Sequence, residues 1–150
     1  MKKSQRLKVI IDLHARQERD ALEALGISQQ KLQELQAQLE NLQSYRLDYL
    51  GKFAVRQQAG INITQLMEFR AFADKLDQAI ESQQQTVSNH EREVQRARKR
   101  WEDAHQRTKS LQKVSDLALV EEMKVEQKRE QAEQDDRAAR SGRKDGTGSA

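Results

Sequence analysis

The sequence predicts an all-α fold in which two long helices form an antiparallel coiled-coil hairpin, the second helix being the longer. Three observations support this prediction. The 150 residues contain no proline, and charged side chains, at 34%, are nearly as frequent as hydrophobic ones, at 35%. This composition is typical of long helices rather than of a β-sandwich, a Rossmann domain or a TIM barrel. Apolar residues also recur at alternating steps of three and four along two segments, which a short turn-forming segment separates.

The first helix is predicted over about residues 4–58. We call its seam the set of positions that the three-and-four spacing places on one face, and from Leu32 to Leu42 every seam residue is leucine. Gly26 and Gly51 lie off the seam, where each costs the helix about 1 kcal/mol without interrupting the packing face. The seam positions of this helix are Ser4, Leu7, Ile11, His14, Glu18, Ala21, Leu25, Ser28, Leu32, Leu35, Leu39, Leu42, Arg46, Tyr49, Phe53 and Arg56.

The turn is predicted at about residues 59–62. Gly60 suits the left-handed backbone conformation that ends a helix. Asn62 is a favoured N-cap residue, and Gln65, three positions later, completes a capping box. A connection this short makes the two helices antiparallel neighbours.

The second helix is predicted over about residues 63–135, and the hairpin is one domain of residues 4–135. In the predicted register Phe53 faces Phe69 and Ala21 faces Trp101, so the longer helix overhangs from about Ala118. After Ala139 the chain is rich in glycine, serine and basic residues, which predicts a disordered tail over residues 140–150. The seam positions of this helix are Leu66, Phe69, Ala73, Leu76, Ile80, Gln83, Val87, His90, Val94, Ala97, Trp101, Ala104, Thr108, Leu111, Ser115, Ala118, Glu122, Val125, Arg129 and Ala132.

Three groups of apolar residues lie off the seam. Near the turn, Tyr45, Phe72 and Ala79 share one flanking heptad position and form a strip with Gln38, which either widens a thin core or binds a partner. At the open end, Val9, Ile10 and Leu13 surround a seam residue. In the overhang, Leu119, Val120 and Met123 have no first-helix partner, so this segment is frayed, folded back, self-associated or docked into another protein.

No catalytic, cofactor or metal site is predicted. His14, His90 and His105 are not spaced as ligands, and His14 and His90 occupy seam positions, where they act as polar register markers. There is no phosphate-binding loop and no nucleophile with a base at motif spacing. The chain is therefore predicted not to be an enzyme. The absence of cysteine fits a reducing cytoplasmic compartment, and no apolar run is long enough to span a membrane.

A basic stretch between Arg92 and Arg107 raises the question of nucleic-acid binding. Acidic residues are interspersed along it, and the basic side chains spread around the helix outside the seam. A solvated helix face is the favoured interpretation, and the net charge of +3 is too balanced to define a polyanion binder. A nucleic-acid-associated coiled coil and a passive structural spacer remain the alternatives.

The turn region carries the most specific residues: the segment 45–49 before the turn, Gly60-Ile61 within it, and the segment 69–80 after it, with Arg100-Trp101 and the opening segment 4–13 in addition. With these residues the chain resembles the FliJ family of flagellar export proteins, which belongs to the type III secretion stalks. The resemblance covers about residues 1–135. It implies a two-stranded coiled coil similar to the gamma subunit of rotary ATP synthases.

The resemblance also implies partners and a location. A FliJ-like chain is a stalk in the ring of the export ATPase FliI, contacts the export gate protein FlhA, and binds export chaperones to recycle them. It is cytoplasmic, and associates with the inner membrane at the flagellar base only peripherally, through the gate. The implied ATPase end is the open end, with Val9, Ile10, Leu13, Leu119, Val120 and Met123. The implied gate-binding residues are Gln38, Leu42, Tyr45, Tyr49, Phe72, Leu76, Ala79 and Gln83.

Overall fold

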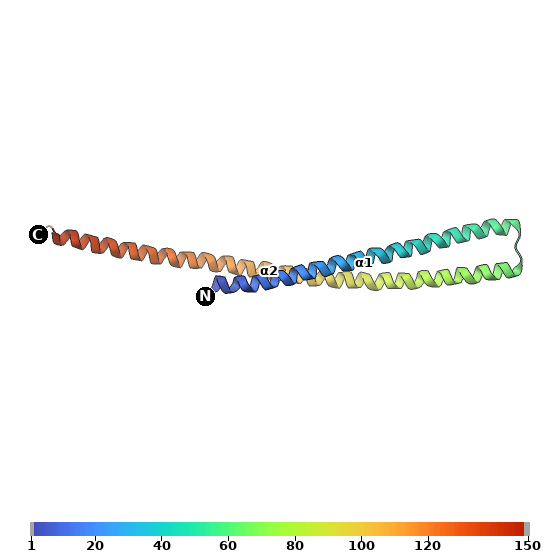
Figure 1. The fold of residues 1–150 in the computed structure, drawn as a ribbon, viewed down its shortest axis with the longest axis horizontal. Coiled ribbons are helices and arrows are strands. Elements are labelled where there is room, and N and C mark those ends of the chain that lie inside the picture. Colours follow the sequence, from blue (N-terminus) through green and yellow to red (C-terminus); the bar gives the residue numbers. More distant parts are fainter. Residues whose placement is uncertain (1, 149–150) are drawn as a thin grey trace. The chain divides into compact units, whose positions relative to one another are not determined.

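The computed structural model describes residues 2–148, and almost all of them belong to two helices. Helix α1 spans Lys3–Ala59 and helix α2 spans Ile63–Gly148, with 57 and 86 residues (Figure 1). The predicted all-α pair of long helices, the second longer than the first, is confirmed. Contacts divide the chain into two units. We call residues 18–103 the hairpin unit, and residues 2–17 together with 104–148 the terminal unit.

The turn forms as the sequence predicts. Gly60 has a φ of 93°, a left-handed conformation that a side chain would disfavour, and its N–H donates to the carbonyl of Gln57. The N–H of Gln65 donates to Oδ1 of Asn62 at 2.7 Å, and the N–H of Asn62 donates to Oε1 of Gln65 at 3.3 Å. This reciprocal capping box starts α2 directly after α1 has ended, so the two helices run antiparallel from the turn (Figure 1).

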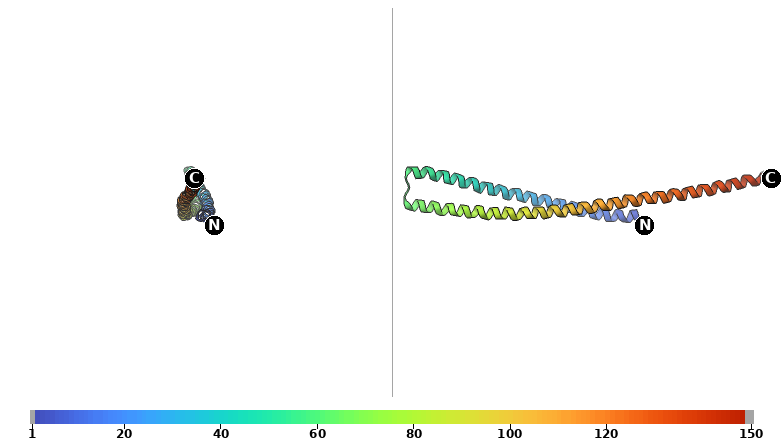
Figure 2. Two further views of the ribbon diagram at one scale, coloured as in Figure 1. Left: turned by 90° about the vertical axis from the view of Figure 1, so that its left-hand side faces the viewer. Right: turned by 180° about the vertical axis from the view of Figure 1, so that it is seen from behind.

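The seam is the packing face of the hairpin unit, where the two helices lie side by side in both views (Figures 1 and 2). Leu25, Val94 and Ala97 form its buried cluster, with Leu32 and Trp101 packed against them. Near the turn the rings of Phe53 and Phe69 stack with their centroids 3.5 Å apart. These contacts agree with the predicted register, which places Leu25 opposite Ala97 and Phe53 opposite Phe69.

Two polar seam residues of α2 reach backbone atoms of α1. Nε2 of Gln83 donates to the carbonyl oxygen of Leu35 at 3.0 Å, and Nε2 of His90 lies 2.9 Å from the carbonyl oxygen of Ser28. Because a carbonyl oxygen only accepts, Nε2 of His90 carries the proton in this contact. Both polar groups are thereby satisfied within the seam, as the interpretation of His90 as a polar seam residue requires.

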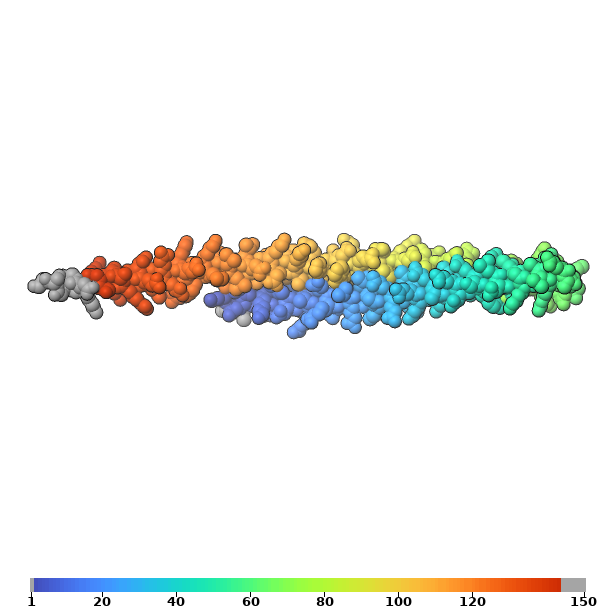
Figure 3. Space-filling model, turned by 90° about the horizontal axis from the view of Figure 1, so that it is seen from above, coloured from blue at the N-terminus to red at the C-terminus, as the bar shows by residue number. Residues whose placement is uncertain are grey.

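In the terminal unit the first residues of α1 lie against α2. Ser4 is 8% exposed, and its N–H and hydroxyl donate to the two carboxylate oxygens of Glu122, at 3.2 and 2.7 Å. Figure 3 shows this N-terminal part of α1 (blue) against the orange part of α2. The predicted start of the overhang at about Ala118 is corrected: Ala118 is buried, and Glu122 still contacts α1. The long carboxylate side chain reaches back to the first turn of α1, which shifts the start of the overhang past residue 122.

Beyond this contact α2 continues with no buried side chain as far as Arg143. Every side chain from Met123 to Arg143 is exposed, and the helix extends to Gly148, past the predicted end at about residue 135. No proline interrupts this segment, and its backbone hydrogen bonds are made within the helix itself. The disordered tail of residues 140–150 stays a prediction about behaviour in solution, and residues 149–150 lie outside the described residues. No helix in the described range is long and apolar enough to cross a membrane.

Candidate partner-binding surfaces

Five aromatic rings form a connected cluster beside the turn, all within the hairpin unit. Tyr45 makes an edge-to-face contact with Phe72, with ring centroids 6.3 Å apart, and lies 6.5 Å from Tyr49. The Tyr49 ring is 4.7 Å from Phe72 and 4.6 Å from Phe69, and Phe69 stacks on Phe53. The chain has six aromatic residues, so nearly all of its aromatic surface is gathered at this end of the hairpin unit.

We call the aromatic edge the eight residues that the resemblance implies for gate binding: Gln38, Leu42, Tyr45, Tyr49, Phe72, Leu76, Ala79 and Gln83. Ring contacts join Tyr45, Tyr49 and Phe72, and a hydrogen bond joins Gln83 to Gln38. The eight residues differ in depth. Leu76 is 7% exposed and belongs to the core, whereas Tyr45 is 51% and Phe72 36% exposed. Gln38 and Ala79 are also exposed. The edge thus consists of a buried base and a solvent-facing aromatic rim.

Gln83 connects the base of this edge to its rim. Its side-chain amide donates to the Leu35 carbonyl and also to Oε1 of Gln38, at 3.3 Å. The half-buried Gln83 therefore holds the side chain of Gln38, which is exposed. The position of Gln38 at the surface depends on a seam residue from the other helix.

An ion pair joins the two helices near this cluster. Arg46 occupies a seam position, and its Nε donates to Oδ1 of Asp77 in an ion pair between the helices. Both side chains are partly exposed, so the pair contributes little to stability. The pair brings two opposite charges together. The aromatic rim itself consists of uncharged side chains.

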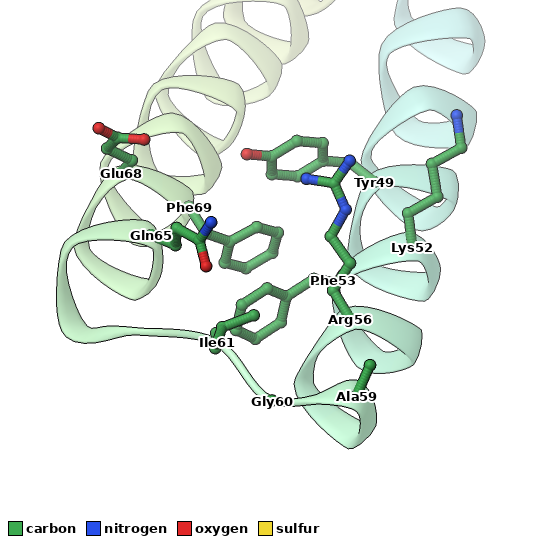
Figure 4. A pocket seen from close by; sticks show the side chains of 10 residues that line it. All are labelled: Tyr49, Lys52, Phe53, Arg56, Ala59, Gly60, Ile61, Gln65, Glu68 and Phe69. Carbon is green, nitrogen blue, oxygen red and sulfur yellow. The ribbon is translucent and has the colours of Figure 1, made fainter.

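A half-open pocket of about 730 Å³ lies next to the turn. We call it the turn pocket; α1 contributes Lys52, Phe53 and Arg56, the turn contributes Ile61, and α2 contributes Glu68 and Phe69. Figure 4 shows the two stacked phenyl rings inside it and the Arg56 side chain extending toward Tyr49. No pattern in the sequence predicted this pocket, although Lys52 and the seam residue Arg56 lie one helical turn apart, on either side of Phe53 in the sequence.

The terminal unit carries the second predicted surface. Val9, Ile10 and Leu13 of α1, together with Leu119, Val120 and Met123 of α2, are between 43% and 63% exposed. These six apolar residues are thus uncovered, as the sequence predicts for residues off the seam.

The contact between Ser4 and Glu122 perturbs one titratable group. The Ser4 hydroxyl, followed by its backbone N–H, holds the pKa of the Glu122 carboxyl below its usual range, and Lys2 adds a smaller effect of the same sign. Partial burial opposes them. No group of residues suited to hold a metal ion occurs among the described residues.

Comparison with known proteins identifies relatives along nearly the whole chain. The family model described as "Flagellar FliJ protein" matches residues 2–147. Two curated relatives, the flagellar FliJ proteins of Salmonella typhi and of Escherichia coli (strain K12), are each 26% identical over 127 residues. The match covers 82% of this chain and 86% of each relative. No solved structure matches the chain.

Proposed function

Because the chain belongs to the flagellar FliJ family, we propose that it is a non-enzymatic stalk that links the export ATPase ring to the export gate. Membership makes it a component associated with flagellar protein export. In the proposed role the aromatic edge binds the gate protein FlhA, and the exposed apolar residues of the terminal unit bind the ring of the ATPase FliI. The chain also assists in recycling export chaperones. It works in the cytoplasm and is held at the inner membrane by the gate alone.

The aromatic rim is the observation that carries the proposal. Tyr45 and Phe72 contact each other across the two helices, yet they leave about half and about a third of their surface in water. Aromatic side chains are enriched among residues that dominate binding energy, because they bury a large apolar area with few rotatable bonds. The base of the edge, including the buried Leu76, holds the rim in place before a partner arrives.

The six apolar residues of the terminal unit support the second contact. Val9, Ile10 and Leu13 are exposed although the seam residues beside them, Leu7 and Ile11, already supply the packing between the helices. Apolar groups that contribute little to the fold and remain in water favour burial against another protein. A ring that surrounds the terminal unit would cover them.

The proposal is tested by reconstitution with purified proteins. The full chain is mixed with FliI and FlhA together and with each alone, and the complexes are separated by size. We expect the chain to bind each partner alone and to bring both into one complex. A chain that binds neither partner would support the passive-spacer alternative, and one that instead binds DNA with steep salt dependence would support the nucleic-acid alternative.

A further inference from the structure

We propose that the turn pocket is a separate binding site for an acidic peptide segment of a partner protein. This peptide carries an apolar side chain close to a carboxylate, and the apolar side chain enters the pocket. The pocket shares only Tyr49 with the aromatic edge, so the proposal does not depend on the gate contact. The apolar side chain would rest on the phenyl rings, and the carboxylate would lie between Lys52 and Arg56.

Three aromatic rings form part of the pocket wall, among polar and charged side chains. The Phe53 and Phe69 rings are nearly parallel, at 13°, and Phe69 is also stacked with Tyr49. All three residues are half-buried, and all three line the pocket. Its volume of about 730 Å³ falls within the roughly 300–1,000 Å³ of ordinary ligand pockets and accommodates a large side chain.

The two cationic side chains at the rim of the pocket, Lys52 and Arg56, favour an anionic ligand. Lys52 and Arg56 are exposed and one helical turn apart, a spacing at which like charges repel each other. Neither side chain forms an ion pair or donates a hydrogen bond within the described residues. A carboxylate between them would relieve this repulsion and accept charge-assisted hydrogen bonds.

The C-terminal end of α1 offers a simpler role for Arg56 alone. A cation in the last turn of a helix is favoured by the negative end of the helix dipole. Lys52 lies a turn farther from that end, where the dipole effect has faded, so it gains little from this role. The pair of cations is therefore better explained by a shared anionic partner than by helix capping.

The pocket is preformed, because its two walls are joined by a turn with little freedom. Gly60 and the capping box of Asn62 and Gln65 define how α2 leaves α1. Lys52, Phe53 and Phe69 stand on helices rather than on loops. A preformed site loses less conformational entropy on binding, which makes recognition of a short segment feasible.

Selection of peptides from a random library displayed on phage tests the proposal, with the full chain as the target. We expect the enriched sequences to combine acidic residues with an aromatic or large aliphatic residue. NMR spectra of the labelled chain, titrated with such a peptide, should show shifts at Lys52, Gly60 and Ile61. Enrichment of basic peptides, shifts confined to other regions, or no enrichment at all would overturn the proposal.

Matched variants separate pocket binding from a general charge effect. The double variant Lys52→Gln with Arg56→Gln should weaken binding of the selected peptide by about tenfold or more, since it removes both cationic partners of the carboxylate. The control Gln57→Glu with Gln58→Glu changes the net charge by the same amount outside the pocket, and should leave most of the affinity intact. Equal losses in the two variants would overturn the site. Removing the one acidic side chain at the rim, with Glu68→Gln, should strengthen binding.

Discussion

Replacing Tyr45 and Phe72 should change the stability of the chain and its affinity for the gate protein by different amounts. Replacing both by alanine should lower stability modestly, by about 1 kcal/mol for each, because a partly exposed ring buries less area than a core side chain. Affinity for the gate protein should fall by about 2 kcal/mol or more, roughly thirtyfold. Melting temperature and gate affinity, measured on the same preparations, check this prediction.

Leu35→Ala is the control for the aromatic rim. Leu35 is 8% exposed in the seam, so its truncation should cost about 2–5 kcal/mol of stability and leave gate affinity nearly unchanged in the folded fraction. Binding to FliI should survive in all of these variants. A Tyr45 and Phe72 variant that melts far earlier but binds the gate normally would show that the two rings serve only the core.

The Glu122 carboxyl makes the stability of the terminal unit depend on pH. Its pKa is lowered in the folded chain by Ser4, so the ionised form stabilises the contact above the ordinary value of 4.5, and this contribution is lost as pH falls through the lowered pKa. NMR titration of the carboxyl carbon should show the low pKa. Ser4→Ala should raise it only partly, because the backbone N–H of residue 4 still donates. An unshifted pKa in the wild-type chain would contradict the contact.

At the scale of the element, α1 can lose its exposed apolar residues without losing its seam. Replacing Val9, Ile10 and Leu13 by polar residues should leave helicity unchanged, since Leu7 and Ile11 remain to pack against α2. Binding to FliI should weaken, as measured by titration calorimetry with circular dichroism as the check on folding. Loss of gate binding with normal FliI binding would reverse the assignment of the two surfaces.

The overhang of α2 should be the least stable element. Residues 123–143 have no buried side chain, and an unpacked helix is stabilised only by local hydrogen bonds and side-chain pairs such as Arg129 with Glu133. We expect amide hydrogens in this segment to exchange much faster than those near Leu25 or Val94 in the isolated chain. Protection equal to that of the seam would indicate that self-association or folding back covers the segment.

For the whole molecule, the register of the two helices decides which residues of α1 and α2 face each other. Spin labels at Ala21 and Trp101, both in the hairpin unit, should lie close together, because the predicted pairing that joins Phe53 to Phe69 also places these two residues opposite each other. A pulsed distance measurement checks this. Widely separated labels would mean that the polar contacts of Gln83 and His90 do not hold the register in solution.

The seam and the turn could be predicted from the sequence because both are local. Every predicted seam position from Ser4 to Phe53 and from Leu66 to Glu122 is buried or half-buried, and the capping box forms between the predicted residues. Periodic spacing decides which face of a helix is apolar, whatever that face later contacts. Val125, Arg129 and Ala132 were also placed on the seam and are exposed, because spacing cannot show where the partner helix ends. Arg56, the last seam position before the turn, is exposed as well and lines the turn pocket.

The sequence by itself therefore determined the number and order of the helices, the turn, most of the seam and the candidate residues beside it. Only the tertiary structure decided which of those residues remain in water, such as Tyr45, and which belong to the core, such as Leu76. The same holds for the contact of Ser4 with Glu122 and for the turn pocket. Each of these features needs side chains from two helices at a particular rotation and distance. Neither spacing nor composition along one chain specifies how far a side chain reaches across to the other helix.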